Sequence, residues 1–402
     1  MKTLADLDSA ALRGKRALVR VDFNVPLDDS GAITDDSRIQ AALPTLRHLL
    51  ESGARVVLMS HLGRPKGKDV EERRQPSLSL APAAQRLGEL LGAGVALAPD
   101  CVGEEVEAAS QALQPGQALL LENLRFHPEE EKNAPEFAQR LARNGDLYVN
   151  DAFGAAHRAH ASTEGVTKFL SPAVAGFLLQ KEVETLGALL QAPPETFVAI
   201  LGGSKVTDKI GVITSLLPRA KHLLIGGAMA NAFLKAEGHE IGKGRLTPED
   251  LDAAHHTLEE TKKHTGSLEL PRDVVVGDDL KAPTQVRTVS VQSIPADLAP
   301  FDIGPETVSA YLEILNGAQT IFWNGPVGVF ETDAYAAGSR ALADALAERA
   351  AAGANVIIGG GDSAAAVARF GLEDAMTFIS TGGGASLEFL EGQVLPGVAA
   401  LE

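Results

Sequence analysis

Short runs of apolar, β-branched residues alternate with longer amphipathic stretches from one end of this chain to the other. This alternation is typical of βα units, in which the strands form a parallel sheet and the helices cover its faces. With 402 residues the chain is long enough for two such units, because a single hydrophobic core stops growing well below this length. The sequence therefore predicts an α/β fold with two Rossmann-like domains joined by a connecting helix and a hinge.

The strands and the domain boundaries follow from where the apolar runs fall. The expected strands are residues 16–21, 55–59, 118–121 and 147–149 in the first half, and 197–201, 223–225, 274–276, 286–291, 320–322 and 356–358 in the second. Residues 172–190, which open with a proline, are predicted to form one helix between the halves. We therefore expect an N-terminal domain at 1–171, an interdomain helix at 172–191, a C-terminal domain at 192–384, and a segment at 385–402 that packs back on the N-terminal domain.

The charge and the cysteine content exclude several classes of protein. The formal net charge is -17, which argues against a sequence-independent grip on nucleic acid or on an anionic membrane. The single cysteine, Cys101, excludes an intrachain disulfide and favours a cytoplasmic location. Residues 1–20 lack the apolar core of a signal peptide, and no apolar run approaches the roughly 20 residues that span a bilayer.

Basic and polar residues in the first half come directly after the expected strands, and Arg38 begins the first long helix. Carboxyl ends of parallel strands converge on one crevice, so these residues can share a site. The residues at these strand ends are Asp22, Phe23, Asn24, His61, Leu62, Gly63, Arg64, Arg125, His157, Arg158 and His160. Because a guanidinium pairs bidentately with carboxylate or phosphate oxygens, the four arginines predict a polyanionic ligand.

Other interpretations of these residues remain open at this point. Each arginine taken alone is more often part of a surface ion pair. His157 and His160 have a spacing that suits a metal on a helix, but their glycine and alanine neighbours indicate a loop. For these two histidines we favour contact with an anion over metal binding, and a purely structural loop role is equally open for at least one of them.

In the second half, Gly202, Gly203, Ser204 and Lys205 follow a strand, and we expect them to lead into a helix that carries Lys209 one turn later. Residues four apart share a helical face, so both ammonium groups would reach one ligand. Glycines allow backbone N–H groups to approach phosphate oxygens, and a helix N-terminus favours an anion. The segment predicts a phosphate-binding turn, although it lacks the Walker A pattern.

Further glycine-rich turns follow later strands of the second half. They comprise Gly226 and Gly227; Asn324, Gly325, Pro326 and Gly328, with Glu331 nearby; and Gly359, Gly360, Gly361, Asp362 and Ser363. A carboxylate beside a phosphate-binding turn suits magnesium, which is commonly held by one or two carboxylates and by phosphate oxygens. Asp362 could alternatively be a helix N-cap.

Two other functional classes fit parts of these patterns. Gly359, Gly361 and Ala364 match a dinucleotide-binding fingerprint, but the acidic residue expected about 20 positions later is missing. A nicotinamide-dependent oxidoreductase is therefore weakly supported. A non-catalytic polyanion-binding protein would leave the turns around Lys205 and Asp362 unexplained.

Seven segments, in this order, carry a family resemblance: VDFNVP at 21–26, HLGRP at 61–65, LENLRF at 121–126, AHRAH at 156–160, GGSK at 202–205, WNGPVG at 323–328 and GGDS at 360–363. With these segments the chain resembles the phosphoglycerate kinase family over essentially its whole length. The resemblance implies reversible phosphoryl transfer from 1,3-bisphosphoglycerate to Mg-ADP, a cytoplasmic glycolytic enzyme and a monomer. Ser363 stands where the family commonly has threonine, and Ala155 where it often has threonine.

The resemblance also implies a role for each matching residue. The 3-phosphoglycerate site would comprise Asp22, Phe23, Asn24, Arg38, His61, Leu62, Gly63, Arg64, Arg125 and Arg158. The ADP/ATP site would comprise Gly202, Gly203, Lys205, Lys209, Gly226, Gly227, Asn324, Pro326, Glu331, Gly360, Gly361, Asp362 and Ser363, with Asp362 on Mg2+. Arg38 and Lys205 would flank the transferred group, so we expect the domains to close by bending at the connector and near residues 382–384.

Overall fold

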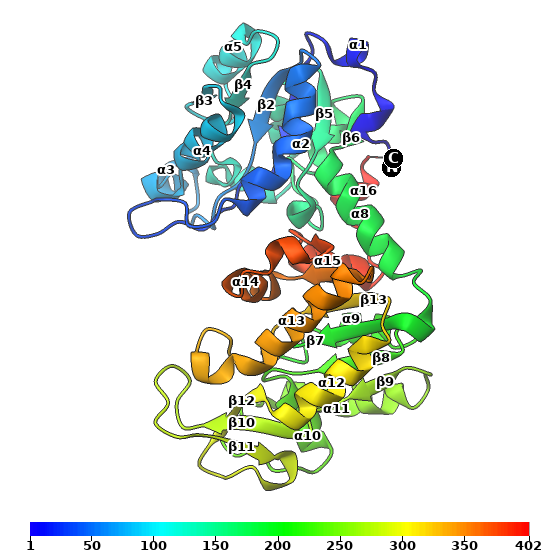
Figure 1. Ribbon diagram of the computed structural model, residues 1–402. Helices are drawn as coiled ribbons and strands as arrows, with labels where there is room; N and C mark the ends of the chain where they lie inside the picture. Colours follow the sequence, from blue (N-terminus) through cyan, green and yellow to red (C-terminus); the bar gives the residue numbers. More distant parts are fainter. Residues whose placement is uncertain (402) are drawn as a thin grey trace. The chain divides into compact units, whose positions relative to one another are not determined.

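The computed structural model describes residues 1–401, which divide into two compact units. Unit 1 comprises Met1–Glu184 together with the segment that starts at Val394, and unit 2 comprises Thr185–Gln393. Each unit contains a six-stranded sheet in which all neighbouring strands are parallel. The predicted fold class is thereby confirmed (Figure 1).

The sheet of unit 1 has the strand order β3-β4-β2-β1-β5-β6. Its strands are β1 (Arg16–Arg20), β2 (Arg55–Met59), β3 (Val95–Leu97), β4 (Ala118–Leu120), β5 (Leu147–Asn150) and β6 (Ala173–Ala175). Its helices are α1 (Ser9–Leu12), α2 (Ser37–Glu51), α3 (Val70–Arg73), α4 (Ala81–Leu91), α5 (Glu104–Ala112), α6 (Pro128–Glu131), α7 (Pro135–Ala142) and α16 (Pro396–Ala399). In Figure 1, α2 and α4 pass in front of this sheet. Nearly every residue of β1, β2 and β5 is buried, as expected for a parallel sheet covered on both faces.

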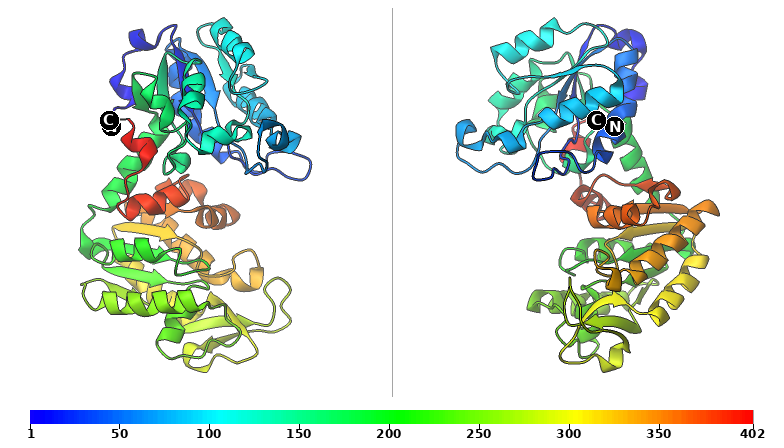
Figure 2. Two further views of the ribbon diagram at one scale, coloured as in Figure 1. Left: turned by 180° about the vertical axis from the view of Figure 1, so that it is seen from behind. Right: turned by 60° about the vertical axis from the view of Figure 1, so that its left-hand side comes forward.

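The main sheet of unit 2 has the strand order β15-β14-β13-β7-β8-β9. Its strands are β7 (Phe197–Leu201), β8 (His222–Ile225), β9 (Ser267–Glu269), β13 (Thr320–Asn324), β14 (Asn355–Gly359) and β15 (Phe378–Ile379). The helices are α9 (Ile210–Leu216), α10 (Ala230–Ala236), α11 (Pro248–Thr261), α12 (Pro305–Asn316), α13 (Ala337–Ala351), α14 (Gly361–Arg369) and α15 (Gly384–Leu390). The packed pair α12 and α13 lies in front of the sheet in Figure 1, and the packed pair α9 and α11 faces the viewer in the left panel of Figure 2.

Two strands expected in the parallel sheet of unit 2 instead lie in a separate sheet. Strands β10 (Asp273–Gly277), β11 (Val286–Ser290) and β12 (Ala299–Ile303) form an antiparallel sheet with the order β11-β10-β12. In the loop between β10 and β11, an Asp278 carboxylate oxygen accepts the N–H groups of Thr284 and Gln285, each at 2.9 Å. This short loop turns the chain back on itself, whereas a parallel neighbour requires a longer crossover.

The helix between the halves begins later than predicted. Residues 173–175 pair with β5 as strand β6, and helix α8 runs over Phe177–Leu189. The Asp151 carboxylate accepts the N–H groups of Leu178 at 2.9 Å and Leu179 at 3.3 Å. A carboxylate from the end of β5 therefore stabilises the first turn of α8, where backbone N–H groups have no partner within the helix. Pro172 lies outside the helix that it was expected to open.

The C-terminal residues contact unit 1 through backbone groups. Leu401 accepts the N–H of Lys2 at 3.0 Å, and Gly397 donates to the carbonyl of Ala156 at 2.8 Å. Within residues 1–401 no helix combines the length and apolar character needed to cross a membrane.

Candidate functional site

The carboxyl edge of the unit 1 sheet brings together the residues that follow β1 and β2. Asp22 and His61 are nearly buried there, with 6% and 7% of their surface exposed. Arg38, from the first turn of α2, donates from Nη1 to Oδ2 of Asp22 at 2.7 Å. The other carboxylate oxygen of Asp22 is buried without a hydrogen-bond partner, and it lies 4.0 Å from Nδ1 of His61. Asp22 therefore orients Arg38 and keeps one buried carboxylate oxygen without a partner in the described chain.

Cations surround His61. Burial lowers its pKa well below the usual 6.5, and the positive charges of Arg20, Arg125 and Arg38 lower it further. The imidazole is therefore neutral at pH 7. The end of β1, the turn after β4 and the first turn of α2 thus each place an arginine near this side chain.

The loop that follows β2 is fixed from two sides. The Gly63 N–H donates to Oδ1 of Asn24 at 2.8 Å, and its carbonyl accepts Nη1 of Arg125 at 2.8 Å. Phe23 and Leu62 are buried and belong to the hydrophobic core of unit 1. Among the predicted substrate residues, Asn24 and Gly63 are thus already engaged with each other.

Arg64 and Arg158 are exposed at the same edge of the sheet. Burial and nearby positive charges, including that of Arg158, lower the pKa of His160 to about 4. In residues 1–401, the only group of three close metal-ligand side chains is Asp100, Cys101 and His127, so neither His157 nor His160 belongs to one.

Sequence reasoning missed Arg20. It is the last residue of β1 and is 1% exposed. Its Nε donates to Oγ of Ser162 at 2.8 Å, and its Nη2 lies 3.0 Å from Nδ1 of His61. A charged residue that follows the apolar run at residues 17–19, two positions before Asp22, was the signal that could have identified it.

In unit 2, three predicted binding turns pack directly on one another. The N–H of Gly202 donates to the carbonyl of Asn324, and the N–H of Gly227 donates to the carbonyl of Val327. A Cβ at Gly202 would lie 2.2 Å from the carbonyl oxygen of Pro326, and one at Gly226 would lie 2.5 Å from Cβ of Val327. Close backbone packing therefore requires glycine at these positions before any ligand is considered.

The end of β13 lies beside the start of α14, and we call the group formed there by Asn324, Gly360 and Gly361 the polar cradle. Asn324 is 1% exposed, and both polar atoms of its side chain are buried without a hydrogen-bond partner in the described chain. Gly360 has a φ of 87° and lies against this amide, whereas a Cβ at Gly361 would meet nothing within 4 Å. Open space, an unpartnered buried amide and a helix N-terminus together suit a phosphate-bearing ligand.

Lys205 and Lys209 do not share a helical face, because α9 begins only at Ile210 and Lys209 is its N-cap. Residues 207–209 form a turn, in which the N–H of Lys209 is bonded to the carbonyl of Val206 at 2.8 Å. Burial lowers the pKa of Lys209 to about 8, and the carboxylates of Asp362 and Asp208 oppose this shift. The predicted helical arrangement is therefore wrong, but the structure adds an electrostatic interaction between Lys209 and Asp362.

The remaining predicted residues of unit 2 differ in exposure. Asp362 is exposed at the second position of α14, and its side chain forms no hydrogen bond or ion pair within residues 1–401. Ser363 is buried, and its hydroxyl accepts the N–H of Gly325 at 2.6 Å, which holds that turn against α14. Pro326 is half-buried and Glu331 is exposed.

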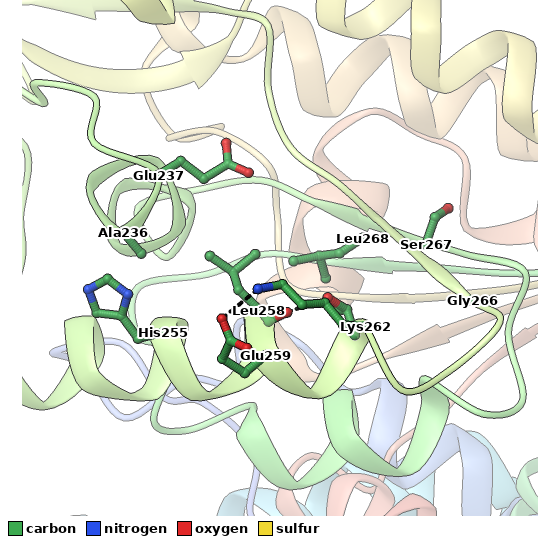
Figure 3. Close-up of a pocket in the computed structure, with 10 residues that line it drawn as sticks. Ala236, Glu237, His255, Leu258, Glu259, Lys262, Gly266, Ser267 and Leu268 are labelled. Carbon is green, nitrogen blue, oxygen red and sulfur yellow. Dashed lines mark hydrogen bonds and ion pairs between the residues drawn. The ribbon is translucent and has the colours of Figure 1, made fainter.

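A separate pocket of about 540 Å³ in unit 2 contains none of these residues. It lies between α10, α11 and β9, with an ion pair of 2.6 Å between Lys262 and Glu259 at its wall (Figure 3). The predicted residues instead gather at the strand ends of the two sheets. Cationic side chains in one unit, and glycine turns with two lysines in the other, thus lie at the carboxyl edges of parallel sheets, where open α/β proteins bind their ligands.

The sequence model described as phosphoglycerate kinase matches residues 7–393, and the chain belongs to this family. The phosphoglycerate kinase of Nostoc punctiforme is 55% identical over 401 residues, covering 100% of this chain and 99% of that protein. That of Moorella thermoacetica is 56% identical, covering 99% and 98%. The solved phosphoglycerate kinase of Coxiella burnetii is 43% identical with a TM-score of 0.86, covering 99% of this chain and 98% of that one.

The family establishes the reaction, which is reversible phosphoryl transfer from 1,3-bisphosphoglycerate to ADP, giving 3-phosphoglycerate and ATP in glycolysis. The substrates are small molecules, and ADP or ATP is the co-substrate. Membership excludes the two alternative classes, the nicotinamide-dependent oxidoreductase and the non-catalytic polyanion-binding protein.

Proposed function

We propose that the cationic cluster of unit 1 binds 3-phosphoglycerate and 1,3-bisphosphoglycerate. The side chains proposed to contact them are Asp22, Asn24, Arg38, His61, Arg64, Arg125 and Arg158. The observation that carries this assignment is the set of arginines around His61 in a chain whose net charge is -17. Arginine retains its charge and matches the oxygens of phosphate and carboxylate, and the free oxygen of Asp22 offers an acceptor to a substrate hydroxyl.

The proposed nucleotide site is the cradle of unit 2. Asn324 supplies a buried amide that has no hydrogen-bond partner among residues 1–401, Gly361 leaves room for the ligand, and Lys205 and Lys209 supply positive charge. Asp362 is the residue proposed to hold Mg2+, because an exposed carboxylate beside a phosphate-binding turn is the ligand this ion prefers. When bound, the ion would neutralise the charge on the phosphate oxygens.

The remaining predicted residues of the nucleotide site are assigned to its walls: Gly202, Gly203, Gly226, Gly227, Pro326, Glu331, Gly360 and Ser363. The close packing of the glycine turns supports a role for several of them in shaping the site.

The mechanism we propose is direct in-line transfer after domain closure. Arg38 and Lys205 flank the moving phosphoryl group and stabilise the charge on its oxygens, and no covalent enzyme intermediate is needed. Closure follows from chemistry, since substrate and nucleotide are assigned to different units and direct transfer requires contact. We place the bending at α8 and near residues 382–384, between domains at 1–171 and 192–384, and we propose a cytoplasmic monomer.

Calorimetric titrations of each ligand test the two assignments separately. Arg125→Ala should weaken binding of 3-phosphoglycerate by about tenfold or more, because a hydrogen bond to a charged group contributes roughly 1.5–3 kcal/mol. The same variant should bind Mg-ADP normally. Loss of nucleotide binding with intact 3-phosphoglycerate binding would refute the assignment. Solution scattering tests closure: an unchanged curve when both ligands bind would count against it.

A further inference from the structure

A continuous chain of buried polar groups runs beneath His61 from Glu130 through Ser162 to Arg20. Glu130 and Ser162 are fully buried, and Arg20 is 1% exposed. None of these three residues is among those assigned to substrate contact. Burying charged and polar groups is costly unless they are paired, so an extended buried network needs an explanation.

The direction of each hydrogen bond between Glu130, Ser162 and Arg20 can be assigned. Ser162 donates its N–H to Oε2 of Glu130 at 3.0 Å and its hydroxyl to Oε1 at 2.6 Å. Because the single hydroxyl proton is used in this way, Oγ of Ser162 accepts from Nε of Arg20 at 2.8 Å. The hydroxyl of Tyr148 donates to the carbonyl of Ser162 at 2.8 Å and holds this residue from another side.

The last link determines the state of His61. Nη2 of Arg20 lies 3.0 Å from Nδ1 of His61, and a guanidinium carries donors only. Nδ1 must therefore present its lone pair, which places the ring proton on Nε2 of a neutral imidazole. The lowered pKa of His61 agrees with this state. Nε2 has no hydrogen-bond partner within residues 1–401 and is not one of the fully buried polar atoms, so its N–H is available to a ligand.

We propose that Glu130 and Ser162 are positioning residues for the reaction: they fix Arg20, and Arg20 holds His61 as the neutral Nε2–H tautomer that donates to an oxygen of the glycerate substrate. Glu130 also compensates the buried charge of Arg20. The other charged or titratable groups near His61 are Arg38, Arg125, His160 and Asp22. The inference rests on the proposed assignment of this cluster to the glycerate substrate.

The tautomer is tested directly on the unaltered enzyme with 15N-labelled histidine. Long-range 1H–15N spectra distinguish a protonated from an unprotonated ring nitrogen. We expect His61 at pH 7 to have its proton on Nε2 alone. An Nδ1–H tautomer, a rapid mixture of tautomers or an imidazolium would overturn the proposal.

Two variants test the role of the network in catalysis. Glu130→Gln is close in shape, but its amide presents one acceptor and one donor to the two donors of Ser162, so one bond must fail. Ser162→Ala removes the acceptor of Nε of Arg20. Each should raise the KM for 3-phosphoglycerate about tenfold, the effect of losing one charge-assisted hydrogen bond, with a much smaller change in kcat. Each should also bring a fraction of His61 into the Nδ1–H tautomer.

Glu129→Gln is the matched control, because it makes the same chemical change on the same short helix at an exposed position. It should leave KM and the His61 spectrum unchanged. If Glu130→Gln does not fold, as judged by thermal unfolding, Ser162→Ala carries the test. A raised KM without any change in the His61 tautomer would contradict the proposal, and so would an unchanged KM.

Titration with 3-phosphoglycerate separates this inference from the site assignment beneath it. If the His61 signals of the unaltered enzyme do not shift at saturating 3-phosphoglycerate, the assignment of the substrate site fails and His61 is not its donor. If they do shift while the variants behave like the unaltered enzyme, the assignment stands and the positioning role fails.

Discussion

The two candidate sites differ in the chemical groups that form them. In unit 1 the site consists of charged side chains that are held by other charged side chains, such as Arg38 by Asp22. In unit 2 it consists largely of backbone, because glycine turns pack on one another through their N–H and carbonyl groups. A substitution in unit 1 should therefore act on chemistry and binding, whereas many substitutions in unit 2 should act first on folding.

Arg38→Ala should have the largest effect. If Arg38 stabilises the transferred phosphoryl group, kcat should fall by about 10³ or more, as for other arginines that act on the transition state, while substrate affinity falls far less. Steady-state kinetics with 3-phosphoglycerate and Mg-ATP measure both quantities. Arg47→Ala, an exposed change on the same helix, is the control and should leave kcat unchanged. Preserved kcat with weakened binding of both ligands would remove Arg38 from the transition state.

Gly202→Ala should destabilise the fold of unit 2. Its Cβ would lie 2.2 Å from the carbonyl oxygen of Pro326. Relieving this overlap requires the backbone to move, which we expect to lower the free energy of unfolding by about 3 kcal/mol. Gly361→Ala is the contrast, because its Cβ meets nothing within 4 Å, so unfolding should change by less than about 0.5 kcal/mol while ADP affinity falls. If denaturant titration showed similar losses of unfolding free energy for both variants, it would contradict the assignment of Gly202 to folding and of Gly361 to binding.

Two of the buried asparagines, one from each unit, allow a direct comparison. Asn123 donates to the carbonyls of Leu62 and Leu78, both at 2.8 Å, whereas the amide of Asn324 has no partner in the described chain. Asn324→Leu should preserve or raise stability, because it removes an unsatisfied buried group. The same variant should lower the affinity for ADP about tenfold. Asn123→Leu should lower the free energy of unfolding by roughly 1–3 kcal/mol, since it leaves partners unpaired. If Asn324→Leu lost stability and kept ADP affinity, the amide would not be a nucleotide ligand.

Lys209 should give nucleotide binding a pH dependence that the arginine site lacks. Its pKa is lowered to about 8, so the ammonium charge is present at pH 7 and is lost as the pH rises through 8. Raising the pH from 7 to 9 should lower the affinity for ADP by up to about tenfold. The affinity for 3-phosphoglycerate should stay the same, because arginine does not titrate in this range. Lys209→Arg should abolish the ADP effect. Persistence of the effect in this variant would place the titrating group elsewhere.

The chemistry-bearing residues were predictable because they follow apolar strands directly. Asp22, His61 and Arg125 can be identified in this way, since parallel strands end at one edge. The antiparallel sheet was not predicted, because the apolar run at β10 resembles a buried parallel strand. The polar residues of β11, which is largely exposed, and the short loop that begins at Asp278 are the signals that distinguish this sheet.

Sequence alone therefore determined the fold class, the family and the residue types available for the reaction. Tertiary structure decided what several of these residues contact. Arg20 is hydrogen-bonded to Ser162, which lies 142 positions away in the chain. Position 202 must be glycine because the turn at Pro326 packs directly against it. Hydrophobic periodicity reports which face of an element is buried, but not which distant group meets it there. The partner of a buried polar group is set by packing, so only the folded chain reveals it.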